Sequence, residues 1–271
     1  MNANANSLKY EVYRADANSF HVGSVLISGE KDAILIDAQF TLADAHRVAA
    51  NILAAGKNLT AIYISHGDPD YYFGLDVLRQ AFPAARIWST RPTLEHIRKT
   101  FEKKLAVWGP KLGQNGTKNV VFPEVLEGDS LQLEGHALVI KGLEGPSPDR
   151  TYVWIPDLKA IVGGVNVYDN LHLWTADAGT KEKRQAWLSI LSGMEKLGAE
   201  IVVPGHALDD RNLNAKAIAF SKNYLTVFDQ EDEIAKDSAE LISAMQMLYP
   251  DAQLGIALQL GAKVTKGEMT W

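Results

Sequence analysis

Ser65-His66-Gly67-Asp68-Pro69-Asp70-Tyr71 follows directly on a short, mostly apolar run, Leu59–Ile64. A run of this length bounded by turn residues predicts a buried strand. A strand end is a rigid platform from which a loop can point several side chains at one place. This loop carries one imidazole and two carboxylates, which are ligands for zinc, iron or manganese. The stretch predicts either a metal site or an Asp-rich turn that caps the next helix, and the spacing alone leaves both open.

A second histidine, His206, follows Pro204-Gly205 at the end of another predicted buried strand, Glu200–Val203. Taken alone, a histidine in this position is more often structural than a metal ligand. Two strand ends can converge on one ion, however. His66 and His206 together therefore favour a shared metal site.

Strands and helices alternate along the chain in two halves, each β-rich at first and helical afterwards. This order predicts an α/β fold of the αββα type, with two mixed sheets packed face to face and helices outside. Residues 108–118 are rich in Gly, Lys and Asn and predict a surface loop beside the site. The predicted strands are 9–13, 22–28, 33–37, 59–64, 85–89, 124–126, 130–133, 136–143, 151–155, 160–163 and 200–203, and the predicted helices are 42–55, 74–81, 92–107, 181–197, 214–248 and 252–260.

The composition indicates a soluble globular protein. The chain has 271 residues, of which 46% are apolar and 22% charged, and this predicts one domain over residues 8–271 with a helical C-terminal portion at 214–260. Residues 1–7 are predicted to be a disordered lead-in. They lack the basic start and apolar stretch of a signal peptide. We therefore expect a soluble protein of the cytoplasm, or of the periplasm if a leader has been removed.

Charge and residue usage exclude several kinds of partner. The net charge of −6 and the lack of a Lys/Arg stripe argue against nucleic acid, and no apolar run is long enough to predict a membrane span. The sequence has no cysteine, which excludes disulfides, thiolate zinc sites and a Cys nucleophile. A small-molecule substrate is the expected partner, and the helical C-terminal portion offers a face for a homodimer.

Beyond these features, the chain resembles the metallo-β-lactamase superfamily over nearly its whole length. That family carries the pattern H-x-H-x-D-H after a buried strand. Here His66 and Asp70 stand at the first His and the Asp of the pattern, while Asp68 replaces the second His and Tyr71 the third. The resemblance therefore identifies the fold and shows that the family's metal-binding motif is incomplete.

The family's later metal ligands are also partly replaced. A later His is expected near Gly145-Pro146-Ser147, where Pro146 stands, and Val165 stands where the family has a bridging Asp. The final His is kept as His206. Asp37 matches an Asp that usually supports the motif loop of the family and does not bind metal.

This ligand set implies at most one metal ion. Two close-set ions need a bridging group, and neither Val165 nor Pro146 can bind metal. One ion held by His66, Asp68, Asp70 and His206 is chemically reasonable. The ion would be zinc, with iron or manganese as alternatives, and the other possibility is that no metal binds. Glu144 or Asp149 could fill the place of the lost His.

The leading hypothesis is a mononuclear hydrolase that activates water to cleave an ester, lactone, thioester or amide. Asp70 or Asp68 would take the proton of the water, and Tyr71 would donate a hydrogen bond to the developing oxyanion. The first alternative is a catalytically inactive protein with a binding or regulatory role. The second is a mononuclear iron-dependent oxidoreductase. Hydrolysis of β-lactams is the least expected activity, because in the family it depends on the missing His cluster.

Overall fold

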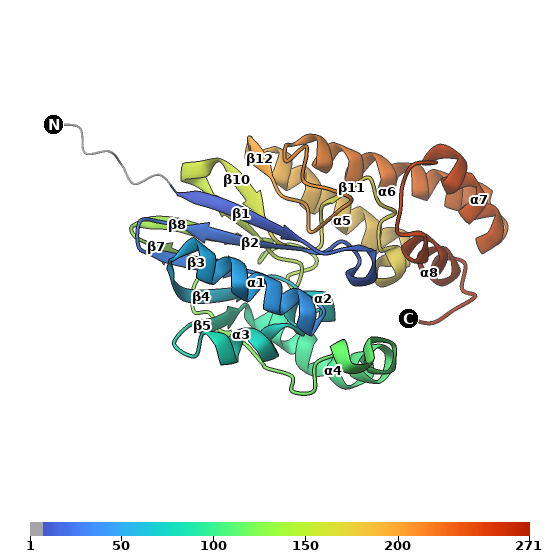
Figure 1. Cartoon of the computed structure of the whole chain (residues 1–271). Helices are drawn as coiled ribbons and strands as arrows, with labels where there is room; N and C mark the ends of the chain where they lie inside the picture. The colour runs from blue at the N-terminus through green and yellow to red at the C-terminus, as the bar shows by residue number, and fades with distance from the viewer. Residues whose placement is uncertain (1–7) are drawn as a thin grey trace.

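The computed structural model describes residues 8–271. Two sheets pack face to face and helices cover both outer sides (Figure 1). One sheet has six strands in the order β1-β2-β3-β4-β5-β6, and the other has five in the order β12-β10-β9-β8-β7. A short pair, β11 and β13, lies beside the site. The predicted αββα fold of the α/β class is confirmed. The predicted lead-in, residues 1–7, lies outside the described residues.

Most strand and helix boundaries follow the sequence pattern, but the helix predicted over 214–248 is two helices, 216–234 and 238–248, because Ala235 is extended and the Asp237 side chain caps the second helix. In the first sheet the strands are β1 (Lys9–Arg14), β2 (Gly23–Ser28), β3 (Asp32–Ile36), β4 (Asn58–Ile64), β5 (Arg86–Ser89) and β6 (Glu124–Val125). In the second they are β7 (Ser130–Leu133), β8 (His136–Lys141), β9 (Tyr152–Ile155), β10 (Ala160–Val162) and β12 (Ile201–Val202), and the short pair is β11 (Tyr168–Asp169) with β13 (His206–Ala207). The helices are α1 (Leu42–Ala55), α2 (Pro69–Tyr72), α3 (Leu75–Ala81), α4 (Arg91–Leu112), α5 (Lys181–Glu195), α6 (Lys216–Ile234), α7 (Ser238–Leu248) and α8 (Gly255–Thr265).

Local chemistry explains where α1 begins and ends. The Thr41 side chain accepts a hydrogen bond from the backbone N–H of Asp44 and caps the first turn. Gly56 ends the helix in the left-handed conformation, with φ of 65°, which glycine adopts without steric cost. The helix then leads straight into β4, whose C-terminal end carries the motif loop.

Two apolar clusters hold the sheets and helices together. One lies between the sheets and joins side chains such as Ile36 and Tyr63 of the first sheet to Val153 and Val162 of the second. The other lies between the sheets and the helices that cover them. Both clusters make the strand ends rigid, and the candidate site lies at those ends.

The prediction of a surface loop over residues 108–118 is wrong in its first part. Helix α4 continues to Leu112 even though Pro110 lies inside it and removes a backbone donor. The Trp108 ring is buried, with its centroid 5.2 Å from that of Phe20 and 5.7 Å from that of Phe40. Burial of a large aromatic ring favours this last stretch of helix. None of the helices in the described part of the chain combines the length and the apolarity that crossing a bilayer would require.

Candidate functional site

His66, Asp68 and Lys104 form the first of two groups at the site. Nε2 of His66 lies 3.1 Å from Oδ2 of Asp68, and Nδ1 lies 3.2 Å from the backbone carbonyl of Asp149. Both partners are acceptors, so the imidazole makes both hydrogen bonds when each nitrogen carries a proton. The other carboxylate oxygen of Asp68 accepts from the ammonium of Lys104, which reaches it from α4. Both nitrogens of His66 thus already have a protein partner.

Asp70, Tyr71 and His206 form the second group. Nδ1 of His206 lies 2.8 Å from the carbonyl oxygen of Phe20, and Nε2 lies 3.0 Å from the Tyr71 hydroxyl. Since a carbonyl can only accept, Nδ1 donates and Nε2 accepts from the phenol. Oδ2 of Asp70 lies 3.4 Å from the same Nε2. The lone pair with which His206 could bind a metal is therefore already in use.

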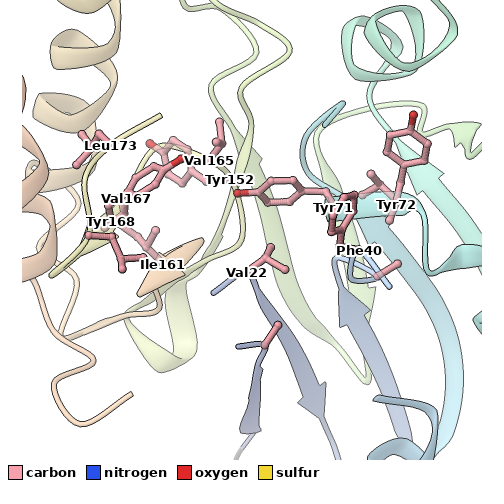
Figure 2. Close-up of a cluster of buried hydrophobic side chains, with 14 of the residues drawn as sticks. Val22, Phe40, Tyr71, Tyr72, Tyr152, Ile161, Val165, Val167, Tyr168 and Leu173 are labelled. Carbon is pink, nitrogen blue, oxygen red and sulfur yellow. The ribbon is translucent and has the colours of Figure 1, made fainter. Parts of the chain in front are cut away.

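The Tyr71 ring contacts both histidines. Its centroid is 5.4 Å from that of His66 and 5.8 Å from that of His206, with interplanar angles of 89° and 82°. Figure 2 shows its hydroxyl extending toward Tyr168 and Val165, while the neighbouring Tyr72 points away. Tyr71 thus packs edge-on against both imidazoles that the sequence predicts to share a metal.

Burial sets the protonation of the second group. It lowers the pKa of His206 to about 3, so the ring is neutral. Burial also raises the pKa of Tyr71 well above its usual range, so the phenol keeps its proton. Burial, and then the Asp68 carboxylate, raise the pKa of Asp70 well above its usual range, which favours the neutral carboxyl.

The Lys104–Asp68 pair keeps both of its charges. Burial disfavours the ionised Asp68, but the Lys104 ammonium and the His66 ring outweigh burial and hold the pKa of Asp68 well below its usual range. Burial likewise disfavours the charged Lys104, yet the Asp68 carboxylate raises the pKa of Lys104 above its ordinary value. Only 14% of the Lys104 side chain and 12% of the Asp68 side chain are exposed. The pair is a largely buried salt bridge.

Asp37 fixes the start of the motif loop, as its match to the family implies. Its carboxyl accepts from the backbone N–H of Ser65 at 2.8 Å and contacts the Ser65 hydroxyl through both oxygens. The Ser65 hydroxyl in turn accepts from the backbone N–H of Gly164 at 2.8 Å. This chain of hydrogen bonds ties the end of β4 to the end of β10 and orients the loop that carries His66.

We expect Asp37→Asn to make stability less dependent on pH. Burial raises the pKa of Asp37 from its ordinary value to about 7, so the stability that its proton contributes is complete below about pH 4 and is lost as pH rises through about 7. Between about pH 5.5 and about pH 8, the wild type should lose about 2 kcal/mol relative to the variant. Urea unfolding at the two pH values measures this difference.

The isosteric amide is the right substitution, because it keeps an acceptor for Ser65 and tolerates the φ of 64° at residue 37. Asp37→Ala is the control that removes the hydrogen bonds, and it should destabilise the protein at both pH values. An equal pH dependence in the wild type and in Asp37→Asn would contradict the raised pKa.

An aromatic pocket of about 440 Å³, measured to include its open mouth, lies above both groups. Asp68, Asp70, Lys104 and His206 line its floor, and Val165 stands beside them. Its walls are mainly aromatic, with Leu254 as an aliphatic neighbour. The aromatic residues are Phe20, Phe40, Trp108, Tyr168, Trp174 and Trp271.

The residues present do not fit a metal in this arrangement. Of the predicted ligands, Asp68, Asp70 and His206 line the pocket and His66 contacts Asp68, but Tyr71 binds His206 and Lys104 binds Asp68. Across residues 8–271, no group of three or more His, Asp or Glu side chains is arranged to hold a metal ion. The metal-ligand and catalytic assignments of these residues and of Tyr71 stay predictions.

Asp149, one of the two residues considered as a replacement ligand, has other partners. Its carboxylate accepts from Nδ1 of His96 at 2.7 Å, and its backbone carbonyl accepts from His66. Burial opposes ionisation, but the hydrogen bond from His96 and the nearby His66 lower the pKa of Asp149 to about 2. Asp149 thus holds the His66 ring through its backbone carbonyl, while its carboxylate binds His96.

Lys104 is the site residue that sequence analysis missed. It lies on a predicted helix 36 positions after Asp68, so no local motif contains it. One feature of the sequence could have identified Lys104. Leu94, Ile97, Phe101 and Trp108 mark the apolar face of that helix at spacings of three to seven, and Lys104 falls on the same face. A lysine on a buried helix face needs a partner, and here the partner is Asp68.

Comparisons with known proteins agree with the fold. The family model described as the metallo-beta-lactamase superfamily matches residues 19–206. No curated protein matches the sequence. Among solved structures, the DIM-1 metallo-beta-lactamase exposed to ceftazidime is 16% identical, with a TM-score of 0.56, covering 83% of this chain and 95% of that one. A metallo-beta-lactamase from Pontibacter korlensis is 15% identical, with a TM-score of 0.56 and coverage of 83% and 97%.

A third structure is similar over more of this chain. The stereoselective inverting sec-alkylsulfatase Pisa1 from Pseudomonas sp. is 14% identical with a TM-score of 0.61, and the match covers 95% of this chain and 50% of that one. This chain therefore corresponds to about half of the alkylsulfatase. At these identities the similarity shows a shared fold, and it does not show a shared activity.

Proposed function

The chain belongs to the metallo-beta-lactamase superfamily, and from that premise we propose that its pocket binds an uncharged, mainly apolar small molecule without a bound metal. One observation carries the proposal. The position where a metal-dependent relative would act is a pocket with aromatic walls and a floor whose charges cancel. Such a pocket has the composition of a small-molecule site, with apolar and aromatic walls and a few polar groups.

The floor selects against charged ligands. Lys104 and Asp68 neutralise each other, and the raised pKa of Asp70 favours its neutral form. An anion would meet the Asp68 carboxylate, and a cation would meet the Lys104 ammonium, so each would lose its water without gaining a free counter-charge. An uncharged ligand with a planar or apolar body and one hydrogen-bonding group avoids this cost and stacks on the walls. Uncharged esters and lactones belong to this class.

Three naphthalene probes that differ in charge test the proposal. We expect isothermal titration calorimetry to give a Kd for 2-naphthol at least about tenfold lower than for 2-naphthoate or for protonated 2-naphthylmethylamine. Trp174→Ala removes a pocket wall and should weaken 2-naphthol binding by about tenfold. Trp154→Ala, on β9 and outside the pocket lining, is the matched control and should leave the Kd unchanged. Equal binding of all three probes, or equal effects of the two variants, would refute the proposal.

Hydrolysis with one metal ion is the second candidate, because three of the four predicted ligands line the pocket and the fourth, His66, contacts Asp68. A bound ion would supply Lewis acidity for cleavage of an ester, lactone, thioester or amide. It would require Lys104 to leave Asp68 and Tyr71 to leave His206. Elemental analysis of protein purified without added metal, with a 4-nitrophenyl ester assay, separates the candidates. A stoichiometric metal with turnover lost in His66→Ala would favour hydrolysis. Stoichiometric iron with oxygen uptake would favour the oxidoreductase.

A further inference from the structure

We infer that Lys104 and Tyr71 together take the place of a metal ion in this protein. The ammonium supplies the positive charge beside Asp68, and the phenol hydroxyl occupies the lone pair of His206. Lys104 and Tyr71 occupy coordinating atoms of Asp68 and His206 whichever ligand enters the pocket. It rests on the contacts of these side chains, on their burial and on the distribution of unpartnered polar atoms.

The first step is the charge at Asp68. Nζ of Lys104 binds one oxygen of Asp68, while the other oxygen lies 3.1 Å from His66. Lys104 comes from α4, a separate element, and its side chain is largely buried at the pocket floor. Asp177 adds a second carboxylate that interacts electrostatically with this ammonium. A divalent ion on Asp68 would lie a few ångströms from a fixed positive charge and would be repelled by it.

The second step is the position of Tyr71. Its ring contacts both imidazoles, and its hydroxyl lies 3.0 Å from Nε2 of His206. The side chain is completely buried. A metal bound to Nε2 of His206 would have to displace this hydroxyl.

The third step is that the coordinating atoms of His66, Asp68 and His206 already have protein partners. Nε2 of His66 lies 3.1 Å from Asp68, Nε2 of His206 lies 3.0 Å from the Tyr71 hydroxyl, and Lys104 binds the other oxygen of Asp68. Unpartnered buried polar groups are costly. Within residues 8–271, the fully buried side-chain polar atoms without a hydrogen-bond partner lie on His21, Ser28, Gln39, Tyr72, Arg150, Asn166 and Thr175.

Removing both the Lys104 ammonium and the Tyr71 hydroxyl should therefore create a metal site. We expect the double variant Lys104→Ala/Tyr71→Phe to bind about one equivalent of Zn²⁺ through His66, Asp68 and His206, at least about a hundredfold more tightly than the wild type. Isothermal titration calorimetry with Zn²⁺ alone gives the affinity, and elemental analysis after dialysis gives the stoichiometry. Neither readout depends on activity.

Two control variants test whether the gain in zinc affinity depends on the Lys104 charge and on the predicted ligand His66. Lys103→Ala/Tyr71→Phe removes an exposed lysine from the same helix and should bind zinc no better than Tyr71→Phe alone. Adding His66→Ala to the double variant should abolish the gain. If the double variant does not fold, Lys104→Met and Tyr71→Phe are measured singly. Stoichiometric zinc binding by the wild type, or no gain in any folded Lys104 variant, would overturn the inference.

Discussion

Asp68→Asn should lower the free energy of unfolding by about 3 kcal/mol. The substitution keeps the size of the side chain but removes the only carboxylate that forms an ion pair with Lys104 among the described residues. Lys104 then keeps a largely buried charge without its counter-charge, and the loss of one partner of a buried pair is far more costly than the loss of both. Guanidinium unfolding at neutral pH and constant ionic strength measures the change.

A double-mutant cycle shows whether the loss of stability comes from the Lys104 ammonium that Asp68→Asn leaves unpaired. Asp68→Asn/Lys104→Met should recover most of the lost stability, because the uncompensated ammonium is then gone. Glu200→Gln breaks the exposed Lys159–Glu200 pair, whose side chains are 60% and 67% exposed, and it should cost at most about 0.5 kcal/mol. If Asp68→Asn costs no more than Glu200→Gln, the ammonium has an alternative partner or reaches water, and the pair at the pocket floor is not what neutralises it.

Most of the fold could be predicted because its signals are local. The apolar run before Ser65 predicts β4, and Thr41 with Gly56 marks the ends of α1, which the structure confirms within one residue. Such features depend on neighbours in the chain. The end of α4 could not be predicted, because the Gly and Lys residues after Trp108 indicate a loop, while burial of the Trp108 ring against Phe20 and Phe40 favours helix.

The candidate site could be predicted only in part, for a similar reason. His66, Asp70 and His206 were predicted to lie at converging strand ends; Asp70 and His206 line one pocket and lie 3.4 Å apart, and His66 contacts the pocket through Asp68. What each side chain binds depends on residues from distant elements. Lys104 on α4 meets Asp68 across 36 positions, and Tyr71 meets His206 across 135. A ligand count identifies which atoms could bind a metal, but it does not reveal partners that already satisfy them.

Gly205 shows how closely the strand ends must approach to build this floor. A Cβ atom at residue 205 would lie 2.1 Å from the carbonyl oxygen of Gly164 and 2.9 Å from the Tyr71 hydroxyl. The first of these atoms belongs to the backbone at the end of β10, so it cannot rotate away. Arg14 holds the other side of the turn, donating to the carbonyl oxygens of Pro204 and Gly205 at 3.0 and 3.1 Å. The turn that presents His206 is fixed from both sides.

Gly205→Ala should therefore lower the free energy of unfolding by about 3 kcal/mol, because backbone must shift to admit one methyl group. It should also weaken 2-naphthol binding, because His206 lines the pocket and a backbone shift at Gly205 would move it. Gly193→Ala is the matched control. It lies inside α5 with nothing within 4 Å of the added Cβ, so stability should stay level or rise by up to about 1 kcal/mol. Urea unfolding of both variants measures the contrast. If Gly205→Ala matched Gly193→Ala in stability, the close approach of β10 and the His206 turn would be absent, and the pocket floor would lose its rigid support.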